Sequence, residues 1–246
     1  MSVPKVIYIA AASEAARIQF MESWLNKTGC IYSRIDGVEL RNSLAVPCYD
    51  REKRLSRFGF DMTHSEIGCF LAHRKTWELV GESRQPALVL ESDCYLNHGI
   101  DLSALLRELS ARLEPREMVR LHGIFERNEG FLRRVHTLEQ GFELVQCLGD
   151  PMGTAAYFIT PAVARKLYSA SERFFEPVDV FLGKTWFHRV SVRTVKPYPF
   201  SVEDFPSVIG DRRRPKQSIK ERLTIELCRA GDDCKRILYM PWHFWG

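Results

Sequence analysis

Two acidic residues at the end of an apolar segment are the most distinctive chemical feature of this sequence. Residues 87–90 are continuously apolar, as is typical of a strand buried on both faces, and Glu91, Ser92 and Asp93 follow directly. Side chains alternate along a strand, so Glu91 and Asp93 are predicted to project to one side and Ser92 to the other. Such a carboxylate pair suits Mg²⁺ or Mn²⁺ bridged to a diphosphate. The alternative is that one acid caps a turn and the other is solvated.

A second set of polar residues has helical spacing. Glu66, Cys69 and His73 fall at i, i+3 and i+7, and these residue types can bind metal ions. Three ligands from one helix rarely enclose a metal, however, and the pattern Thr63-x-x-Glu66 is typical of a capping box. A structural role for Glu66 and His73 is therefore the simpler interpretation.

The elements that would position these residues begin with a βαβ unit. The sequence predicts a strand over residues 6–10, a helix capped by Ser13 and ending at Gly29, and a second strand that ends at Asp36-Gly37. Such a start favours an α/β fold with a largely parallel sheet.

The pattern continues through most of the chain. Helices are predicted over residues 63–81, 102–113 and 161–167, and strands over 87–90, 119–121, 133–148 (an antiparallel pair), 155–159 and 190–195. One domain is expected over residues 1–246, with residues 203–246 as an irregular tail that is rich in basic and aromatic side chains.

Composition excludes several classes of protein. The chain has 246 residues, 45% of them hydrophobic, and a net charge of +4, so disorder and a nucleic-acid partner are not expected. Its seven cysteines form an odd set without a C-x-x-C pair, which favours free thiols and a cytoplasmic location. No apolar run approaches the roughly 20 residues that span a bilayer, so any membrane association is expected to be peripheral.

Four segments resemble bacterial glycosyltransferase family 25, the lipooligosaccharide and lipopolysaccharide biosynthesis transferases. The likeness lies in residues 6–20, 63–77, 87–96 and 153–167, and also in the Pro177-Val178-Asp179 triplet. The family pattern E-I-G-C-x-x-S-H-x-x-x-W is the most specific part. It appears here from Glu66 to Trp77, with Ala72 where serine is usual.

The resemblance implies a GT-A-type, Rossmann-like fold and an inverting transfer of a hexose from a UDP-sugar, usually UDP-galactose, to a lipooligosaccharide or related glycan. It also implies Mn²⁺ or Mg²⁺ held by Glu91 and Asp93. The sequence departs from the family at Ser92, where aspartate is usual, and at Ala10-Ala11, where Asn-Leu is typical. On the strand argument Ser92 points away, so metal binding is expected to survive.

Substrate-binding residues are expected by analogy with the family. The nucleotide would contact Ala10, Ala11, Arg17 and Asp36, and the sugar would lie against Gly153 and Thr154. Asp179 is the expected general base, with helix capping as its alternative role.

Three further residues or groups remain as expectations. Asp150 is a reserve base. His243 is a candidate third metal ligand, with a tail that packs on the core as the equal alternative. The basic residues near the C-terminus favour contact with phosphates or with the anionic inner membrane, although a charge run is usually a solvated face. They are Arg212, Arg213, Arg214, Lys216, Lys220 and Arg222.

Two other functions remain open at this point. The chain could be a family member that uses another donor or a protein or capsule acceptor. It could also be a catalytically weak protein that binds nucleotide sugars, because of Ser92 and the Ala10-Ala11 pair.

Overall fold

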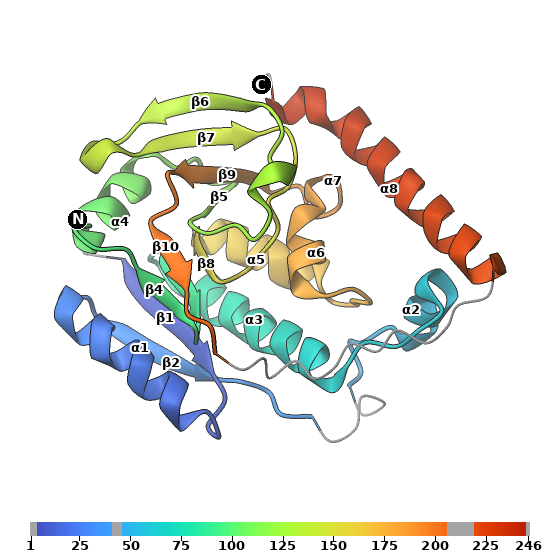
Figure 1. Ribbon diagram of the computed structural model, residues 1–246, viewed down its shortest axis with the longest axis horizontal. Helices are drawn as coiled ribbons and strands as arrows, with labels where there is room; N and C mark the ends of the chain where they lie inside the picture. Colours follow the sequence, from blue (N-terminus) through green and yellow to red (C-terminus); the bar gives the residue numbers. More distant parts are fainter. Residues whose placement is uncertain (1–3, 41–45, 206–218, 245–246) are drawn as a thin grey trace.

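A large mixed sheet forms the centre of the computed structural model, which describes residues 4–40, 46–205 and 219–244 (Figure 1). Within these residues eight strands pair in the order β2-β1-β3-β8-β5-β9-β7-β6. The strands are β1 (Lys5–Ala10), β2 (Tyr32–Asp36), β3 (Ala87–Glu91), β5 (Glu117–Arg120), β6 (Leu132–Thr137), β7 (Glu143–Cys147), β8 (Ala156–Ile159) and β9 (Ser191–Lys196).

The strand directions confirm the predicted α/β class with a mainly parallel sheet. β1 pairs in parallel with β2 and β3, and β5 pairs in parallel with β9. β8 is antiparallel to β3 and β5, and β7 is antiparallel to β6 and β9. β8 and β7 therefore oppose the other strands. A short separate pair joins β4 (Cys94–Leu96) to β10 (Phe200–Val202).

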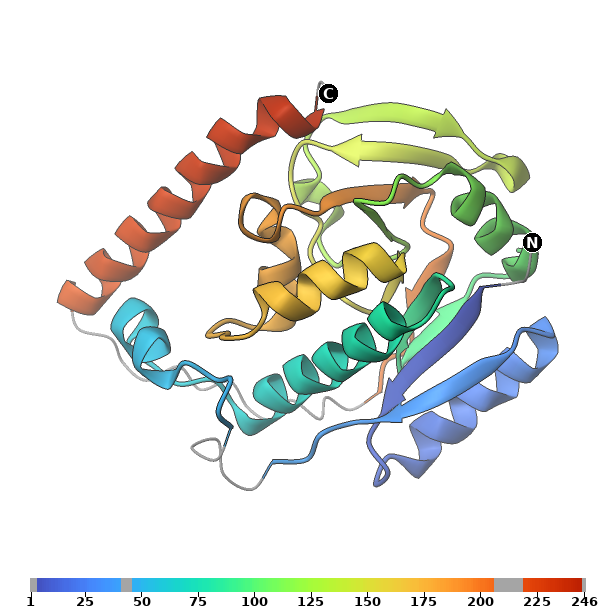
Figure 2. The same cartoon turned by 180° about the vertical axis from the view of Figure 1, so that it is seen from behind.

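Helices cover both faces of the sheet (Figures 1 and 2). Their bounds are α1 (Ala15–Thr28), α2 (Arg51–Phe58), α3 (His64–Glu82), α4 (Leu102–Arg112), α5 (Pro161–Ala170), α6 (Val178–Gly183), α7 (Thr185–His188) and α8 (Ile219–Phe244). One apolar cluster joins α3, α5 and α6 to the sheet, and another joins α1 and α4 to it. Alternate residues of β1 and β3 enter opposite clusters, as the twofold period of a strand requires.

Local capping fixes the start of α3, the helix that carries His73. The Thr63 hydroxyl accepts from the Glu66 amide at 3.1 Å, and the Glu66 carboxylate accepts from the Thr63 amide at 2.9 Å. The predicted capping box is thus confirmed. The predicted Ser13 cap is wrong, because α1 has Glu14 at its N-cap and the Ser13 hydroxyl donates to Glu39 instead.

The expectation of an irregular tail is wrong for residues 219–244, which form the 26-residue helix α8. Its exposed side includes Leu223 and Leu227, whereas Ile225 is buried. This separation by helical position reflects an amphipathic sequence, which the analysis of residues 203–246 missed. In the described part of the chain, no helix has both the length and the apolar character needed to cross a membrane.

Ion pairs attach α8 to the rest of the fold. Asp232 of α8 lies 2.7 Å from Lys184 and 3.2 Å from Arg57 of α2. Lys184 in turn lies 2.6 Å from Glu176, just before α6. These charged contacts hold α8 beside α2 and α7.

Several of the predicted basic residues cannot be placed. Arg212, Arg213, Arg214 and Lys216 lie outside the described residues, as do the side chains of Lys220 and His243.

Candidate active site

Parallel pairing brings several of the predicted site residues to one edge of the sheet. Ile9 of β1 pairs with Glu91 of β3, and Ala10 pairs with Asp36 of β2. The carboxyl ends of β1, β2 and β3 therefore meet at this edge, where open α/β sheets commonly bind ligands.

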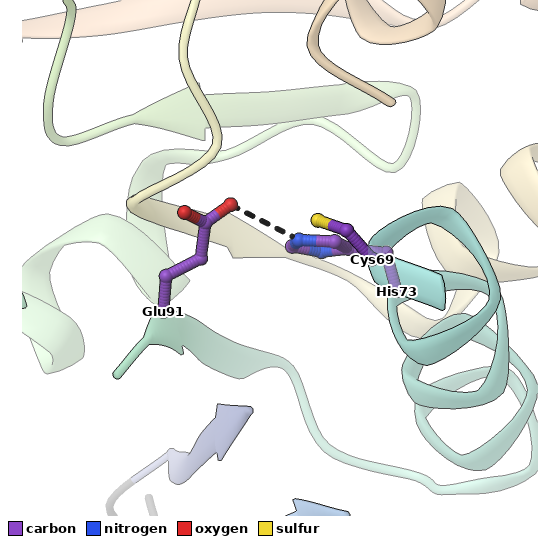
Figure 3. A group of neighbouring side chains, drawn as sticks. All are labelled: Cys69, His73 and Glu91. Atoms are coloured by element: carbon purple, nitrogen blue, oxygen red, sulfur yellow. Dashed lines mark hydrogen bonds and ion pairs between the residues drawn. The ribbon is translucent and has the colours of Figure 1, made fainter. Parts of the chain in front are cut away.

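Glu91 ends β3 and is held by two neighbouring side chains, of which Figure 3 shows His73. His73 Nε2 lies 3.3 Å from its Oε1, and the Thr154 hydroxyl donates to the same oxygen. Burial alone would raise the pKa of Glu91, but the hydrogen bonds from His73 and Thr154 lower it below its usual value. Glu91 is therefore held as a carboxylate.

A buried chain of hydrogen bonds sets the orientation of His73. The Trp77 indole N–H donates to the Tyr157 hydroxyl at 3.0 Å, and this hydroxyl lies 2.8 Å from His73 Nδ1. Because the Tyr157 hydroxyl already accepts from Trp77, its own proton can be donated to His73 Nδ1. The single proton of a neutral imidazole then lies on Nε2. His73 then donates to Glu91, as the structural role inferred from the sequence requires.

Asp93 lies in the turn after β3, where Arg17 contacts it. Arg17 Nη1 donates to Asp93 Oδ2 at 3.1 Å and to the Ser92 hydroxyl at 3.3 Å. Burial, and next the charge of Glu91, raise the pKa of Asp93 despite the opposing charge of Arg17. Glu91 and Asp93 are thus held by different helices, Glu91 by His73 of α3 and Asp93 by Arg17 of α1.

The predicted orientation of Ser92 is wrong. Strand alternation ends at Glu91, because Ser92 and Asp93 form a turn before β4. Ser92 consequently lies beside Asp93 on the shared Arg17 rather than pointing away from it. Its hydroxyl helps to place Arg17.

Two carboxylate oxygens at this edge suit a hard divalent cation. Asp93 Oδ1 is buried without a hydrogen-bond partner, which is costly unless a cation or donor reaches it. Within the described residues, the hydrogen bonds to the Glu91 carboxylate go to Oε1 and none goes to Oε2. Mg²⁺ and Mn²⁺ prefer such oxygen ligands, so the side chains present fit the cation expected from the sequence.

The residues expected to bind the nucleotide already have internal partners. The Ala10 carbonyl accepts from the Gly37 amide at 2.9 Å, and the Ala11 amide donates to Glu14 at 2.7 Å. Asp36 lies 3.0 Å from Arg34. These contacts shape the loop ends at the carboxyl edge, and a role for the residues in donor binding stays a prediction.

Gly153 and Thr154 connect Glu91 to the interior of the sheet. Gly153 has a φ of +92°, in the region that favours glycine, and its carbonyl accepts from Arg120 at 2.9 Å. This turn places the Thr154 hydroxyl on Glu91. Sequence reasoning did not identify Arg120 or Tyr157, although a charged residue directly after the apolar Met118-Val119 of β5 was a visible signal.

Asp179 occupies the first turn of α6 and lines a cleft of about 1430 Å³. Glu66 and Asp150 line the same cleft, and residues of α2 and α8 form its far side. The N-cap of α6 is Pro177, and Asp179 in the first turn accepts from the Val180 amide at 2.8 Å, so its carboxylate also contacts the start of the helix. Burial, and then the charges of Glu91, Asp179 and Asp93, raise the pKa of the nearby Cys69 thiol.

Asp150, the reserve base, is engaged in structural contacts. It lies 3.2 Å from the guanidinium of buried Arg120 and accepts from the Met152 amide at 2.9 Å. A Cβ at Gly183 would approach Asp150 Oδ2 to 1.8 Å, so the carboxylate packs directly on α6. These contacts favour a positioning role for Asp150.

Comparisons with known proteins identify the class of the chain. Residues 4–182 match the model of glycosyltransferase family 25, described as LPS biosynthesis protein, and the chain belongs to this family. A search of curated proteins gave no match. Among solved structures, the chain is similar to UDP-glucose pyrophosphorylase complexed with UDP-glucose, with 14% identity and a TM-score of 0.40. That alignment covers 82% of this chain and 92% of the other.

Proposed function

We propose that this chain is an inverting glycosyltransferase with a single GT-A-type domain over residues 1–246. It moves a hexose, with galactose as the first choice, from a UDP-sugar to a lipooligosaccharide, a lipopolysaccharide or a related surface glycan. Membership of family 25 supports the transferase class. The observation that carries the proposal is a pair of carboxylate oxygens, Glu91 Oε2 and Asp93 Oδ1, at the carboxyl edge of parallel strands. Neither oxygen accepts a hydrogen bond within the described residues.

In this proposal Glu91 and Asp93 hold Mn²⁺ or Mg²⁺. When bound, the cation offsets the charge that develops on the departing nucleotide diphosphate. His73 and Thr154 keep Glu91 ionised and oriented, and Arg17 fixes Asp93. Preorganisation of this kind lowers the cost of assembling the site when the donor arrives.

The donor would lie along the carboxyl edge of the sheet. Ala10, Ala11, Arg17 and Asp36 are proposed to contact the nucleotide because they end or follow β1 and β2, beside Glu91. Gly153 and Thr154 would contact the sugar. The positive φ at Gly153 brings the backbone close to the space beside Glu91.

Asp179 is the proposed general base. Inversion requires a group that takes the proton from the acceptor hydroxyl as that oxygen attacks the anomeric carbon. Asp179 lines the cleft from the first turn of α6 and belongs to the Pro177-Val178-Asp179 triplet that resembles the family. The acceptor would thus enter through the cleft between α2, α6 and α8.

A lipid-linked acceptor would require the enzyme to work at a membrane surface. We propose peripheral contact with the anionic cytoplasmic leaflet through the basic segment around Arg212–Arg214 and the outer face of α8. Leu223, Leu227 and Leu238 of that face are 60%, 74% and 75% exposed. An apolar helix face that follows a cluster of basic residues is complementary to an anionic lipid surface.

A donor screen tests the proposed function. Purified protein with Mn²⁺ is incubated with common UDP-hexoses, with and without glycan acceptors, and released UDP is measured. Release that is fastest with UDP-galactose and depends on an acceptor is expected. A failure to release UDP from any donor would contradict the proposal and favour a protein that only binds nucleotide sugars.

A further inference from the structure

Three different metal-binding side chains converge on the side of Glu91 that faces α3. Cys69 and His73 are one helical turn apart on α3, and Glu91 ends the neighbouring strand (Figure 3). The ligand atoms of the three residues all lie within 4.8 Å of one another. Their chemistry differs from that of the pair formed by Glu91 and Asp93, because sulfur and imidazole nitrogen prefer softer ions.

The spacing of these atoms fits a tetrahedral ion. Zinc binds imidazole nitrogen and carboxylate oxygen at about 2.0–2.1 Å, which separates the two donors by about 3.3 Å in a tetrahedral site. His73 Nε2 and Glu91 Oε1 are 3.3 Å apart. Among the described contacts, the sulfur of Cys69 makes no hydrogen bond. Metal binding would therefore not have to break one at this atom. The third atom, the Cys69 sulfur, lies within 4.8 Å of both.

The surroundings of the cluster also favour a cation. The Tyr157 hydroxyl lies 2.8 Å from His73 Nδ1 and is placed to accept from an Nδ1–H, the arrangement that commonly orients a metal-binding imidazole. Burial, and then the negative charges of Glu91, Asp179 and Asp93, raise the pKa of the Cys69 thiol. A divalent ion would offset this negative potential.

We propose that Cys69, His73 and Glu91 form a binding site for a thiophilic divalent ion of the zinc class. The fourth position would be taken by water, as in open zinc sites. Binding would release the Cys69 proton to solvent and place the single imidazole proton on Nδ1, from which it would donate to the Tyr157 oxygen. The Tyr157 O–H, which donates to Nδ1 in the free protein, would rotate away from that nitrogen. The Nε2 lone pair and Glu91 Oε1 then both face the ion.

The site would also regulate transfer, and this consequence rests on the proposed function. A zinc-class ion at Oε1 of Glu91 lies beside the hard cation proposed at Oε2. Two neighbouring dications repel each other, so occupancy of the softer site weakens Mn²⁺ binding and slows transfer.

Cobalt(II) titration of the purified protein tests the site without a donor or acceptor. Cobalt substitutes for zinc and gives a charge-transfer absorption only when a thiolate binds it. The wild type is expected to show this band at one cobalt per chain, to lose it when zinc is added and to keep it in excess Mg²⁺. Cys69→Ser should lack the band.

Cys48→Ser is the matched control, because Cys48 is also partly buried and packs near the same apolar cluster. It should behave like the wild type. Absence of the band in the wild type, or an equal band in Cys69→Ser, would overturn the proposed site whether or not the protein is a transferase.

The regulatory consequence has a separate readout. Zinc should slow UDP release at least about tenfold in the wild type and in Cys48→Ser, each relative to its own rate without zinc. Cys69→Ser should be slowed much less. Equal slowing of all three proteins would overturn the regulation, and the cobalt result would still decide the site.

Discussion

The hydroxyl of Tyr157 lies 2.8 Å from Nδ1 of His73, and this contact decides which imidazole nitrogen carries the proton that faces Glu91. Trp77 donates to the same hydroxyl from the other side at 3.0 Å. Both aromatic side chains and His73 are buried, so the chain of hydrogen bonds is shielded from water. Through this chain, side chains packed between α3 and the sheet fix the orientation of the Glu91 carboxylate at the end of β3.

Removing this hydroxyl tests its influence on Glu91. Tyr157→Phe is expected to weaken Mn²⁺-dependent turnover by about 10- to 100-fold, as is usual when a group that orients a metal ligand is lost. It should also lower the free energy of unfolding by about 1–3 kcal/mol, because the Trp77 N–H loses its acceptor. Mn²⁺ titration of UDP release and denaturant unfolding measure the two effects. Tyr168→Phe is the control, since its hydroxyl reaches surface Glu78, and equal behaviour of the two variants would contradict the argument.

Asp93→Asn should separate activity from stability. Burial and the neighbouring Glu91 disfavour the charge on Asp93, so a neutral amide is expected to leave the melting temperature unchanged or slightly higher. Turnover should fall by at least about 100-fold, because a metal ligand supplies several kcal/mol of charge stabilisation. UDP release and thermal melting give both values. The exposed Asp204→Asn is the control, and retained turnover in Asp93→Asn would refute the proposed ligand role.

Asp179→Asn tests the general base. The kcat is expected to drop by about 10²–10⁴-fold while the KM for the donor changes little. Steady-state kinetics with varied donor and acceptor distinguish these parameters. A loss of donor affinity equal to the loss of turnover would indicate a structural role instead.

Asp150→Ala is expected to affect stability, in contrast to the loss of turnover expected for Asp179→Asn. Asp150 is expected to matter for stability, since its loss leaves the buried guanidinium of Arg120 without its ion-pair partner. A fall in unfolding free energy of about 1–3 kcal/mol is predicted from denaturant unfolding.

Gly68→Ala tests the packing that positions α3. A Cβ at Gly68 would lie 2.1 Å from the Val38 carbonyl oxygen, which is backbone and cannot move aside cheaply. The substitution is expected to destabilise the protein by about 1–3 kcal/mol. Gly231→Ala in α8 is the control, because no atom lies within 4 Å of the added carbon. Denaturant unfolding should show Gly231→Ala neutral or up to about 1 kcal/mol more stable. A Gly68→Ala protein as stable as this control would contradict the close approach.

Vesicle binding tests the membrane contact. Replacing Arg212, Arg213 and Arg214 with Ser should weaken binding to anionic vesicles by about 3 kcal/mol, or roughly 100-fold, at about 1 kcal/mol per charge. Cosedimentation at increasing salt measures the effect, and zwitterionic vesicles should bind neither protein. Exposed Arg84, Arg107 and Arg116 replaced together give a control with the same net charge. Equal weakening in both triple variants would mean that net charge alone drives binding.

The sequence predicted elements whose signals are local. The capping box at Thr63 and Glu66 and the apolar run before Glu91 both appear in the structure. Each depends on interactions within a few residues, or on a period that burial imposes on one strand. The family resemblance over the same segments is confirmed by the family match.

The missed features depend on where elements meet. The orientation of Ser92 required knowing that β3 ends at Glu91 rather than two residues later. The contact between Tyr157 and His73 joins residues 84 positions apart, which no short pattern contains. The α8 helix was obscured because its apolar positions alternate with charges that pair with α2 and with Lys184.

The attachment of α8 has a consequence for how this protein can vary. Among the described side chains, both apolar clusters of the sheet draw on residues no later than Phe200, and Ile225 of α8 belongs to neither. The helix therefore contributes one wall of the cleft while adding little to the folding energy of the body. Sequence change in this wall can reshape what enters the cleft without putting the fold of the sheet at risk.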